Sequence, residues 1–253
     1  MQSPLVTIVT VVFNDVTKIE GTIENVLSQY LYYENIEYII IDGGSTDGTV
    51  DVINRYSDRI NYWVSEPDRG VYDAMNKAIK LATGNWICFM NSGDLFANSD
   101  VIAKIVSAIN EESQILYGDT FVTTEYGCNL VKAKECSYLK NNMPFCHQST
   151  LVRTDIIKPF DTSYRFVADY NFFYKSYMEG LKFQYVSLAI SVFDATEGLT
   201  ASNKRNVFKE ILRVRKDTDN IISRGLFMCK YYRYFILEQI KRFFPSFVKA
   251  IRN

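Results

Sequence analysis

The stretch IEYIIIDGGSTDGTVDVI, residues 36–53, sets an isoleucine-rich run directly before a turn of glycine, serine and aspartate. β-Branched residues in such a run favour a buried strand over 36–41, and the three glycines favour a sharp turn. Asp47 can cap a helix there, since apolar residues recur after it at helical spacing. The stretch therefore predicts a strand, a polar turn and a helix in succession.

Similar units lie on both sides of this stretch. Apolar runs that predict strands lie at 5–13, 60–64 and 86–90, and helical patterns follow them at 19–30, 74–82 and 102–109. Four strand-and-helix units in a row predict an α/β protein with a Rossmann-like, open, mostly parallel sheet and helices on both faces.

The pattern changes at about Ser113. The later strand-like runs are short, and they lie at 114–117, 121–124, 148–152 and 182–186. A helix is expected at 168–178, and no repeat or low-complexity linker divides the chain. We therefore expect one domain over residues 1–200, with a mixed second half, and a C-terminal helical extension over 201–253.

Composition excludes several classes of protein. The chain has 253 residues, of which 47% are hydrophobic, so it can bury a core and is not intrinsically disordered. A net charge of −1 gives no electrostatic case for nucleic acid as a partner. The five cysteines are scattered without the paired spacing of zinc sites, so we expect reduced thiols in a cytoplasmic protein.

The charge is unevenly distributed. Residues 204–253 carry 13 basic and 4 acidic side chains. Apolar residues recur at three- and four-residue intervals from Cys229 to Ile251, and Pro245 should kink or break this helix. Charged residues interrupt this segment, and no run reaches the ~18 apolar residues of a membrane span. Two interpretations stay open for residues 225–253. They form a helix packed on the protein's own core or on a second subunit of a homodimer, or an interfacial helix on anionic lipid at the inner face of the cytoplasmic membrane.

Polar residues lie at the carboxyl ends of three of the predicted strands. Asn14, Asp42 and Asp94 each follow an apolar run, and ligands of open α/β sheets bind at the carboxyl ends of the strands. Any one of these side chains alone could instead cap a helix or stabilise a turn. The turn after Asp42 lacks a P-loop lysine, and no strand is followed by the G-x-G-x-x-G dinucleotide motif.

Six motifs along the first 200 residues together carry a family resemblance. They are 7–14, 42–49, 66–77 (EPDRGVYDAMNK), 82–84, 89–94 (FMNSGD) and His147-Gln148-Ser149 with Ala168-Asp169-Tyr170. In this order they resemble the family 2 glycosyltransferases of the GT-A fold, of the type that builds bacterial surface polysaccharides. The resemblance implies a GT-A domain over 1–200, a nucleotide-sugar donor, most simply a UDP-hexose or UDP-N-acetylhexosamine, and a Mn²⁺ or Mg²⁺ cofactor. It also implies inverting transfer to a glycan or polyprenyl-diphosphate-linked acceptor.

The resemblance also assigns roles to individual residues. The donor-binding positions are Thr10, Phe13, Asn14, Asp42, Gly44, Asp68, Tyr72, Asp73, Asn76, Asn91 and Ser92. Asp94 matches the metal ligand of the D-x-D motif, although Asn91 stands where that motif has its first carboxylate. Asp169 matches the catalytic base, which takes the proton of the acceptor hydroxyl.

Alternatives remain for these assignments. Asp169 could cap the helix at 168–178, and His147, the sole histidine, is either structural or in contact with metal, diphosphate or acceptor. The whole chain could be a catalytically silent nucleotide-sugar-binding scaffold, since its D-x-D is incomplete. An actin-like sugar kinase is the third hypothesis, because the turn at 42–46 resembles its phosphate loop.

Overall fold

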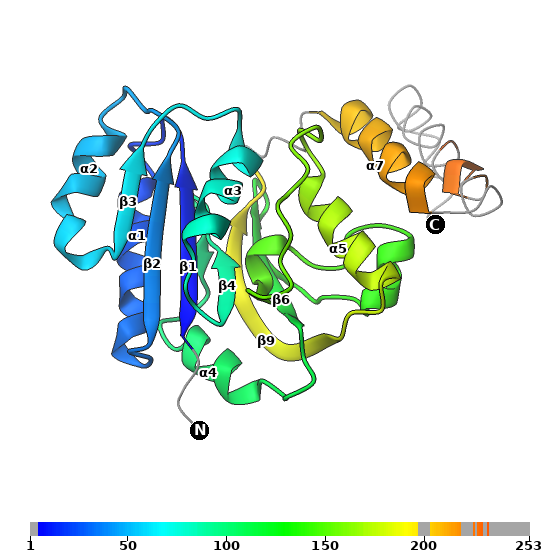
Figure 1. Ribbon diagram of the computed structural model, residues 1–253, viewed down its shortest axis with the longest axis horizontal. Coiled ribbons are helices and arrows are strands. Elements are labelled where there is room, and N and C mark those ends of the chain that lie inside the picture. The colour runs from blue at the N-terminus through cyan, green and yellow to red at the C-terminus, as the bar shows by residue number, and fades with distance from the viewer. Residues whose placement is uncertain (1–4, 197–202, 219–224, 226, 230–231, 233–253) are drawn as a thin grey trace. The chain divides into compact units, whose positions relative to one another are not determined.

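The computed structural model describes residues 5–196, 203–218, 225, 227–229 and 232. It divides into two compact units, residues 1–207 and 208–253, which are described one at a time. Within the described residues, the first unit contains all the strands and most of the helices (Figure 1).

The first four predicted strands form the parallel half of a nine-stranded sheet. They are β1 (Val6–Val12), β2 (Ile36–Asp42), β3 (Tyr62–Ser65) and β4 (Trp86–Phe89), in the spatial order β3-β2-β1-β4. All three pairings are parallel, so the carboxyl ends of these strands meet at one edge. This part of the sequence prediction is confirmed.

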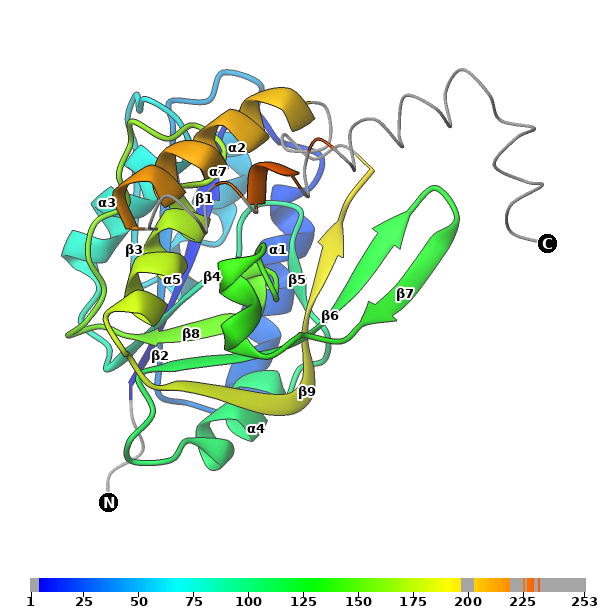
Figure 2. The same ribbon diagram turned by 90° about the vertical axis from the view of Figure 1, so that its right-hand side faces the viewer.

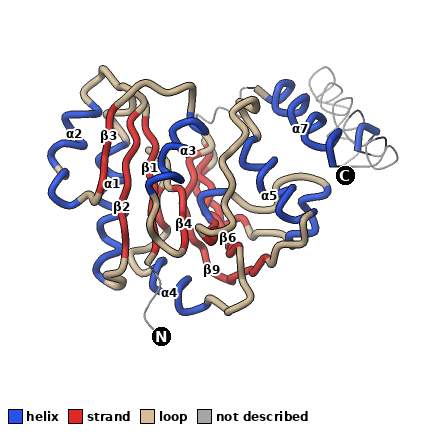
Figure 3. Tube along the Cα trace, in the orientation of Figure 1, coloured by secondary structure: helices blue, strands red, loops and turns tan. Residues whose placement is uncertain are grey.

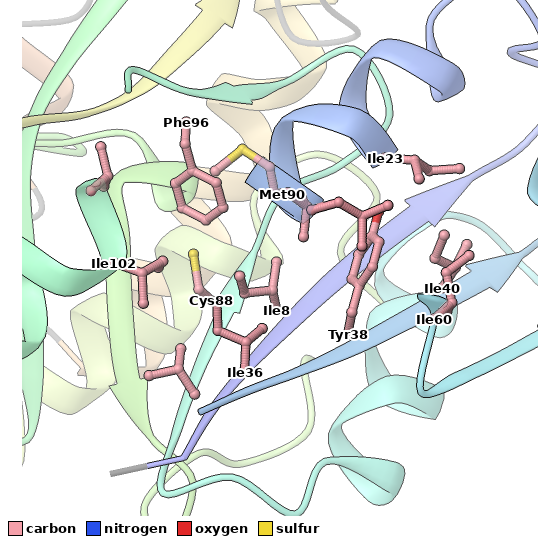
Figure 4. Packing of buried hydrophobic residues seen from close by; sticks show 14 of the residues in the cluster. Ile8, Ile23, Ile36, Tyr38, Ile40, Ile60, Cys88, Met90, Phe96 and Ile102 are labelled. Atoms are coloured by element: carbon pink, nitrogen blue, oxygen red, sulfur yellow. The ribbon is translucent and has the colours of Figure 1, made fainter. Parts of the chain in front are cut away.

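Helices cover both faces of this half, as predicted. They are α1 (Ile19–Ser28), α2 (Thr49–Arg55), α3 (Val71–Leu81) and α4 (Val101–Ala108). Because side chains alternate along a strand, β1 and β2 can bury both faces. On one face Ile8, Tyr38 and Ile40 pack in a cluster with Ile23 of α1 (Figure 4). α3 packs on β1 and β2 from the other side (Figure 1).

The second half of the sheet is mixed, which confirms the change of pattern at about Ser113. It consists of β5 (Leu95–Phe96), β6 (Ile115–Thr124), β7 (Gly127–Val131), β8 (Thr150–Arg153) and β9 (Phe183–Asp194). β8 pairs antiparallel with both β4 and β6, whereas β9 runs parallel to β6. β6 and β7 form a hairpin (Figure 2).

The boundaries of these later strands differ from the prediction. The two runs at 114–117 and 121–124 are a single strand, because β6 continues through Gly118 with a register shift against β9. A Cβ at Gly118 would lie 2.6 Å from the carbonyl oxygen of Leu188, so only glycine lets the two strands approach this closely. β5 and β7 were not predicted.

One long helix and four short 3₁₀ helices complete the first unit (Figure 3). α5 (Ala168–Met178) agrees with the predicted 168–178 and buries aromatic side chains. The 3₁₀ helices are η1 (Gln29–Leu31), η2 (Ser57–Arg59), η3 (Cys136–Lys140) and η4 (His147–Ser149).

α7 (Lys204–Thr218) begins in the last residues of the first unit and continues into the second. In the second unit the rings of Phe208 and Phe227 stack with centroids 5.9 Å apart, and the guanidinium of Arg215 lies 4.0 Å from the Phe227 ring. Most of the amphipathic segment predicted at 225–253 lies outside the described residues. Among those described, no helix is long and apolar enough to cross a membrane.

Gly84→Ala is expected to destabilise the fold by about 1–3 kcal/mol, because the new methyl group overpacks a tight turn. A Cβ there would lie 2.6 Å from Thr7 Oγ1 and 2.8 Å from the carbonyl oxygen of Leu5. Gly21→Ala in α1 is the matched control, since a Cβ at Gly21 meets nothing within 4 Å and alanine favours a helix. Thermal unfolding that affects both variants equally would contradict the overpacking argument.

Candidate active site

The loops after β1 and β2 are tied together by their own polar side chains. Asp42 is fully buried, and its Oδ2 accepts hydrogen bonds from the backbone N–H groups of Gly44 (3.0 Å) and Ser45 (2.9 Å) and from Ser65 Oγ (2.6 Å). Asn14, at φ 48°, accepts from the backbone N–H of Thr46 at 2.9 Å. These bonds fix the shape of the carboxyl edge of the sheet.

Two adjoining cavities open at this edge. The loop cavity, about 750 Å³, lies between the loops after β1 and β2 and the start of α3. Its lining includes Phe13, Gly43, Asp68, Arg69 and Asp73. The carboxylate cavity, about 630 Å³, is lined by three aspartates, by His147 and Gln148, and by residues from β6 to β9; the aspartates are Asp94, Asp169 and Asp194. Tyr72, Asn91 and Arg165 line both cavities, so the two adjoin at these residues.

Asp94 lies deep in the carboxylate cavity. Its side chain is 7% exposed, and Gln148 Nε2 donates to its Oδ2 at 2.9 Å. Burial raises the pKa of Asp94 to about 6, and the bond from Gln148 and the nearby His147 only partly oppose that rise. Asp94 therefore sits where its negative charge is poorly compensated by the chain itself.

A hard divalent cation fits the residues beside Asp94. The side-chain oxygen Oδ1 of Asn91 is buried and has no hydrogen-bond partner. Carboxylate and amide oxygens are the ligands that Mg²⁺ and Mn²⁺ prefer. Ser92 is less suited, because its Oγ donates to Asp15 Oδ2 at 2.7 Å. Among the residues that the structure describes, no three His, Cys, Asp or Glu side chains form a preformed metal cluster, so this chain would supply only part of a coordination shell.

Asp169 faces the same cavity from the first turn of α5. The Tyr72 hydroxyl donates to its Oδ1 at 2.9 Å, and Nδ1 of His147 lies 3.4 Å from its Oδ2. Burial acts to raise the pKa of Asp169, but the bond from His147, the charge of that ring and the bond from Tyr72 outweigh it. The pKa is therefore lowered, and the group is ionised at neutral pH. The N-cap of α5 is Val167, so Asp169 is not the cap residue.

His147 connects these two groups. While its Nδ1 faces Asp169, its Nε2 lies 3.3 Å from Nδ2 of Asn91. The ring is held in η4, where Thr150 Oγ1 donates to the backbone carbonyl of His147 at 2.6 Å.

The structure brings most of the residues singled out from the sequence to the two cavities. Nine of them line a cavity: Phe13, Asp68, Tyr72, Asp73, Asn91, Ser92, Asp94, His147 and Asp169. Five line neither cavity: Thr10, Asn14, Asp42, Gly44 and Asn76. These five hold the surrounding loops and strand ends in place. For example, Thr10 Oγ1 donates to the carbonyl of Met90 at 2.8 Å, and Asn76 Nδ2 donates to the carbonyl of Phe160 at 2.8 Å.

Five charged lining residues were missed by sequence reasoning: Lys18, Arg69, Lys132, Arg165 and Asp194. Arg69 lies inside the motif at 66–77, and its guanidinium pairs with Asp73 at 2.8 Å, which holds the pKa of Asp73 below its usual value. The i, i+4 spacing of Arg69 and Asp73 is visible in the sequence and could have predicted this ion pair. Lys18 and Asp194 are far apart in sequence, and no local pattern predicts their 3.9 Å contact.

A family comparison agrees with this geometry. The model of glycosyl transferase family 2 matches residues 7–175, the region that contains the sheet edge, Asp94 and Asp169. The chain belongs to this family. Its fold is the GT-A fold, and the sugar kinase hypothesis is thereby excluded.

Two relatives show how far the similarity extends. Over 113 residues the chain is 39% identical to an uncharacterized glycosyltransferase of Mycobacterium tuberculosis, a match that spans 45% of this chain and only 43% of that protein. It is 30% identical over 215 residues to the UDP-Glc:alpha-D-GlcNAc-diphosphoundecaprenol beta-1,3-glucosyltransferase WfaP of Escherichia coli, and this match covers 83% of each chain.

A solved structure of similar fold is the mannosyltransferase PcManGT from Pyrobaculum calidifontis in complex with GDP-Man and Mn²⁺. The TM-score is 0.66 at 16% identity, over 86% of this chain and 64% of that one. At this identity the likeness concerns the fold alone.

Proposed function

We propose that this family member is a metal-dependent, inverting glycosyltransferase that moves a sugar from a nucleoside-diphosphate donor onto an acceptor hydroxyl. The observation that carries the proposal is the carboxylate cavity. Within it an ionised carboxylate, Asp169, shares one space with a buried carboxylate, Asp94, and the unpartnered oxygen of Asn91. Transfer in a single displacement needs two separate groups. One accepts the proton of the acceptor hydroxyl, and the other holds the departing diphosphate.

The donor enters from the loop cavity in this proposal. Its nucleoside lies near Phe13, Asp68 and Asp73, and its diphosphate reaches the junction at Tyr72 and Asn91, which line both cavities. Thr10, Asn14, Asp42, Gly44, Asn76 and Ser92 contribute by holding the loops in shape. UDP is the proposed nucleotide, because the name of the related WfaP specifies UDP-Glc.

Asp94 and Asn91 Oδ1 would hold a Mn²⁺ or Mg²⁺ ion. When bound, such an ion neutralises the negative charge that builds up on the leaving diphosphate. The solved structure of PcManGT, which has a similar fold, is in complex with GDP-Man and Mn²⁺.

Asp169 is the proposed base. An acceptor hydroxyl that binds against the carboxylate gives its proton to Asp169 as its oxygen forms the new glycosidic bond. Tyr72 and His147 orient the carboxylate and keep it ionised, so that it is ready to accept that proton. Attack from the side opposite the leaving group inverts the anomeric carbon.

The proposed acceptor is a glycan or polyprenyl-diphosphate-linked sugar in bacterial surface polysaccharide synthesis. The name of WfaP specifies a diphosphoundecaprenol-linked acceptor. The alternative, a catalytically silent scaffold, is disfavoured because Asp169 is held in the ionised form that can accept the proton of an acceptor hydroxyl.

Release of nucleoside diphosphate tests this function. The full chain is incubated with UDP-hexoses, UDP-N-acetylhexosamines and GDP-mannose, each with and without Mn²⁺ and with a lipid-linked acceptor. Cation-dependent release from at least one donor is expected. Tight binding of a nucleotide-sugar with no release from any donor would support the scaffold instead.

We also propose that residues 225–253 hold the enzyme at the inner face of the cytoplasmic membrane. From Arg224 onward the sequence has seven basic residues and one acidic residue. Each Lys or Arg near an anionic lipid surface contributes about 1 kcal/mol, and salt screens that contribution. The full chain is therefore expected to sediment with anionic liposomes at low salt, and a chain truncated after residue 224 to stay in the supernatant. If the full-length protein does not bind the liposomes and the truncated protein no longer forms a dimer, residues 225–253 form a subunit interface instead.

A further inference from the structure

The β6–β7 hairpin carries a strip of apolar side chains that begins in the carboxylate cavity. Thr120 of β6 pairs with Val131 of β7, and both line the cavity. Because side chains alternate along a strand, Val122, two residues further along β6, lies on the same face. Its partner on β9 is Phe193, which also lines the cavity. Val131, Val122 and Phe193 therefore form one apolar strip that leads from the cavity onto the hairpin (Figure 2).

The apolar strip is open to solvent. All five residues of β7 are exposed, and Val122 and Phe193 are only partly buried. Among the described strands, β7 pairs with β6 alone, so no further strand covers its outer edge. An exposed apolar strip that continues the wall of a cavity is suited to the apolar part of a ligand bound in that cavity.

Lys132 places a positive charge at the mouth of the same cavity, since it follows β7, lines the cavity and is exposed. The backbone N–H of Ala133 donates to the buried carboxylate of Asp119 at 2.9 Å. That of Lys134 donates to the carbonyl of Pro144 at 3.0 Å. These two bonds fix the backbone beside Lys132, but its ammonium makes no hydrogen bond or ion pair with any residue that the structure describes.

The charges of the cavity decide how a ligand with several parts can lie in it. Asp169 is ionised, and Asp94 lies in the same cavity. An anionic group is therefore repelled from these carboxylates and attracted to Lys132. A molecule with a neutral sugar, an anionic group and an apolar chain, in that order, can place its sugar at Asp169, its anion at Lys132 and its chain on the apolar strip.

We propose that Lys132 binds the diphosphate of a lipid-linked acceptor and that the apolar strip binds the first part of its lipid chain. A lysine ammonium is a compact charge with three donors, which suits phosphate oxygens at an open cavity mouth. This inference rests on the proposed function, because it takes Asp169 as the group that receives the acceptor hydroxyl.

Binding of farnesyl diphosphate to the full chain tests this site without a transfer reaction. The affinity is measured by calorimetry in EDTA and without UDP. The unmodified protein is expected to bind, and Lys132→Gln to bind about tenfold or more weakly, as when one charge-assisted hydrogen bond is lost. Lys134→Gln is the matched control and should bind normally, because Lys134 lines neither cavity and its ammonium lies 4.0 Å from the centroid of the Tyr138 ring.

A variant of the apolar strip separates the lipid chain from the diphosphate. Val131→Thr keeps a β-branched side chain in the exposed strand β7 but adds a hydroxyl group to the strip. Its affinity for farnesyl diphosphate should fall several-fold, and its affinity for inorganic pyrophosphate should stay that of the unmodified protein. Equal farnesyl diphosphate affinities in the unmodified protein, Lys132→Gln and Val131→Thr would overturn the proposal. Vesicles of phosphatidylglycerol that bind through Lys132, without binding of farnesyl diphosphate, would assign the hairpin to the membrane surface and also overturn it.

Transfer kinetics distinguish this inference from the proposed function. Two acceptors with the same sugar are compared, one linked to a lipid diphosphate and one without phosphate. In Lys132→Gln the preference for the first acceptor, as a ratio of kcat/KM values, is expected to fall about tenfold through a higher KM. An unchanged preference overturns the inference and leaves the proposed function standing. If the unmodified protein transfers sugar to neither acceptor, the proposed function fails, and binding of farnesyl diphosphate still decides whether Lys132 holds a lipid diphosphate.

Discussion

Asp169→Asn is expected to lower kcat by about 10²–10⁴-fold, the contribution of a general base. Asparagine keeps the shape of the side chain and an oxygen that can accept from His147, so the cavity keeps its form. It cannot take the proton of the acceptor hydroxyl. Affinity for UDP with Mn²⁺ should stay unchanged, because the base acts on the acceptor and not on the donor.

Steady-state kinetics and calorimetry on the same preparation check this result. Asp58→Asn is the matched control, because Asp58 is an exposed carboxylate in η2 that lines neither cavity. An Asp169→Asn protein that turns over normally but melts several degrees lower would show that the carboxylate has a structural role only.

Asp94→Asn should make the protein more stable and at the same time abolish cation-dependent donor binding. Burial raises the pKa of Asp94 from 3.8 to about 6, so the native state holds this proton more tightly than the unfolded chain. The stabilisation from the protonated group is full below pH about 3.8 and is lost as pH rises through about 6. Above that pH the buried charge destabilises the fold, and the neutral amide removes a cost of about 2–3 kcal/mol.

Thermal unfolding at two pH values checks the sign of this effect. Without metal, Asp94→Asn is expected to melt higher than the unmodified protein at pH 7.5, and the difference should shrink toward pH 4. With UDP and Mn²⁺ the order should reverse, since only the unmodified protein gains stability from the ligands. A mutant that still gains stability from UDP and Mn²⁺ would rule out Asp94 as the cation ligand.

The parallel half of the sheet could be predicted from sequence because its signals are local. Isoleucine-rich strands buried on both faces, glycine turns and amphipathic helices repeat within short windows, as in the stretch at 36–53. The mixed half is set by contacts over long distances. At Gly118 β6 lies so close to β9 that only glycine fits, and β7 is an exposed partner of β6 without an apolar pattern of its own.

The sequence predicted which residue types form the candidate site. It did not predict how their side chains are arranged in space. The strand-end rule and the family motifs placed Asp94 and Asp169 at the site, and both line the carboxylate cavity. The same reasoning treated Asp42 as a ligand-binding carboxylate; it lines neither cavity, and its oxygens accept hydrogen bonds from its own loop and from Ser65 at the end of β3. The path from Asn91 through His147 to Asp169 joins three separate segments, so it appears only in three dimensions.

A crystal structure of the full chain with UDP and Mn²⁺, with anomalous diffraction from manganese, tests the central claim most directly. The account predicts a manganese peak beside the carboxylate of Asp94 and Oδ1 of Asn91, with the diphosphate on the ion and Asp169 free to contact an acceptor. UDP and manganese bound away from both cavities, or manganese coordinated by Asp169, would contradict it.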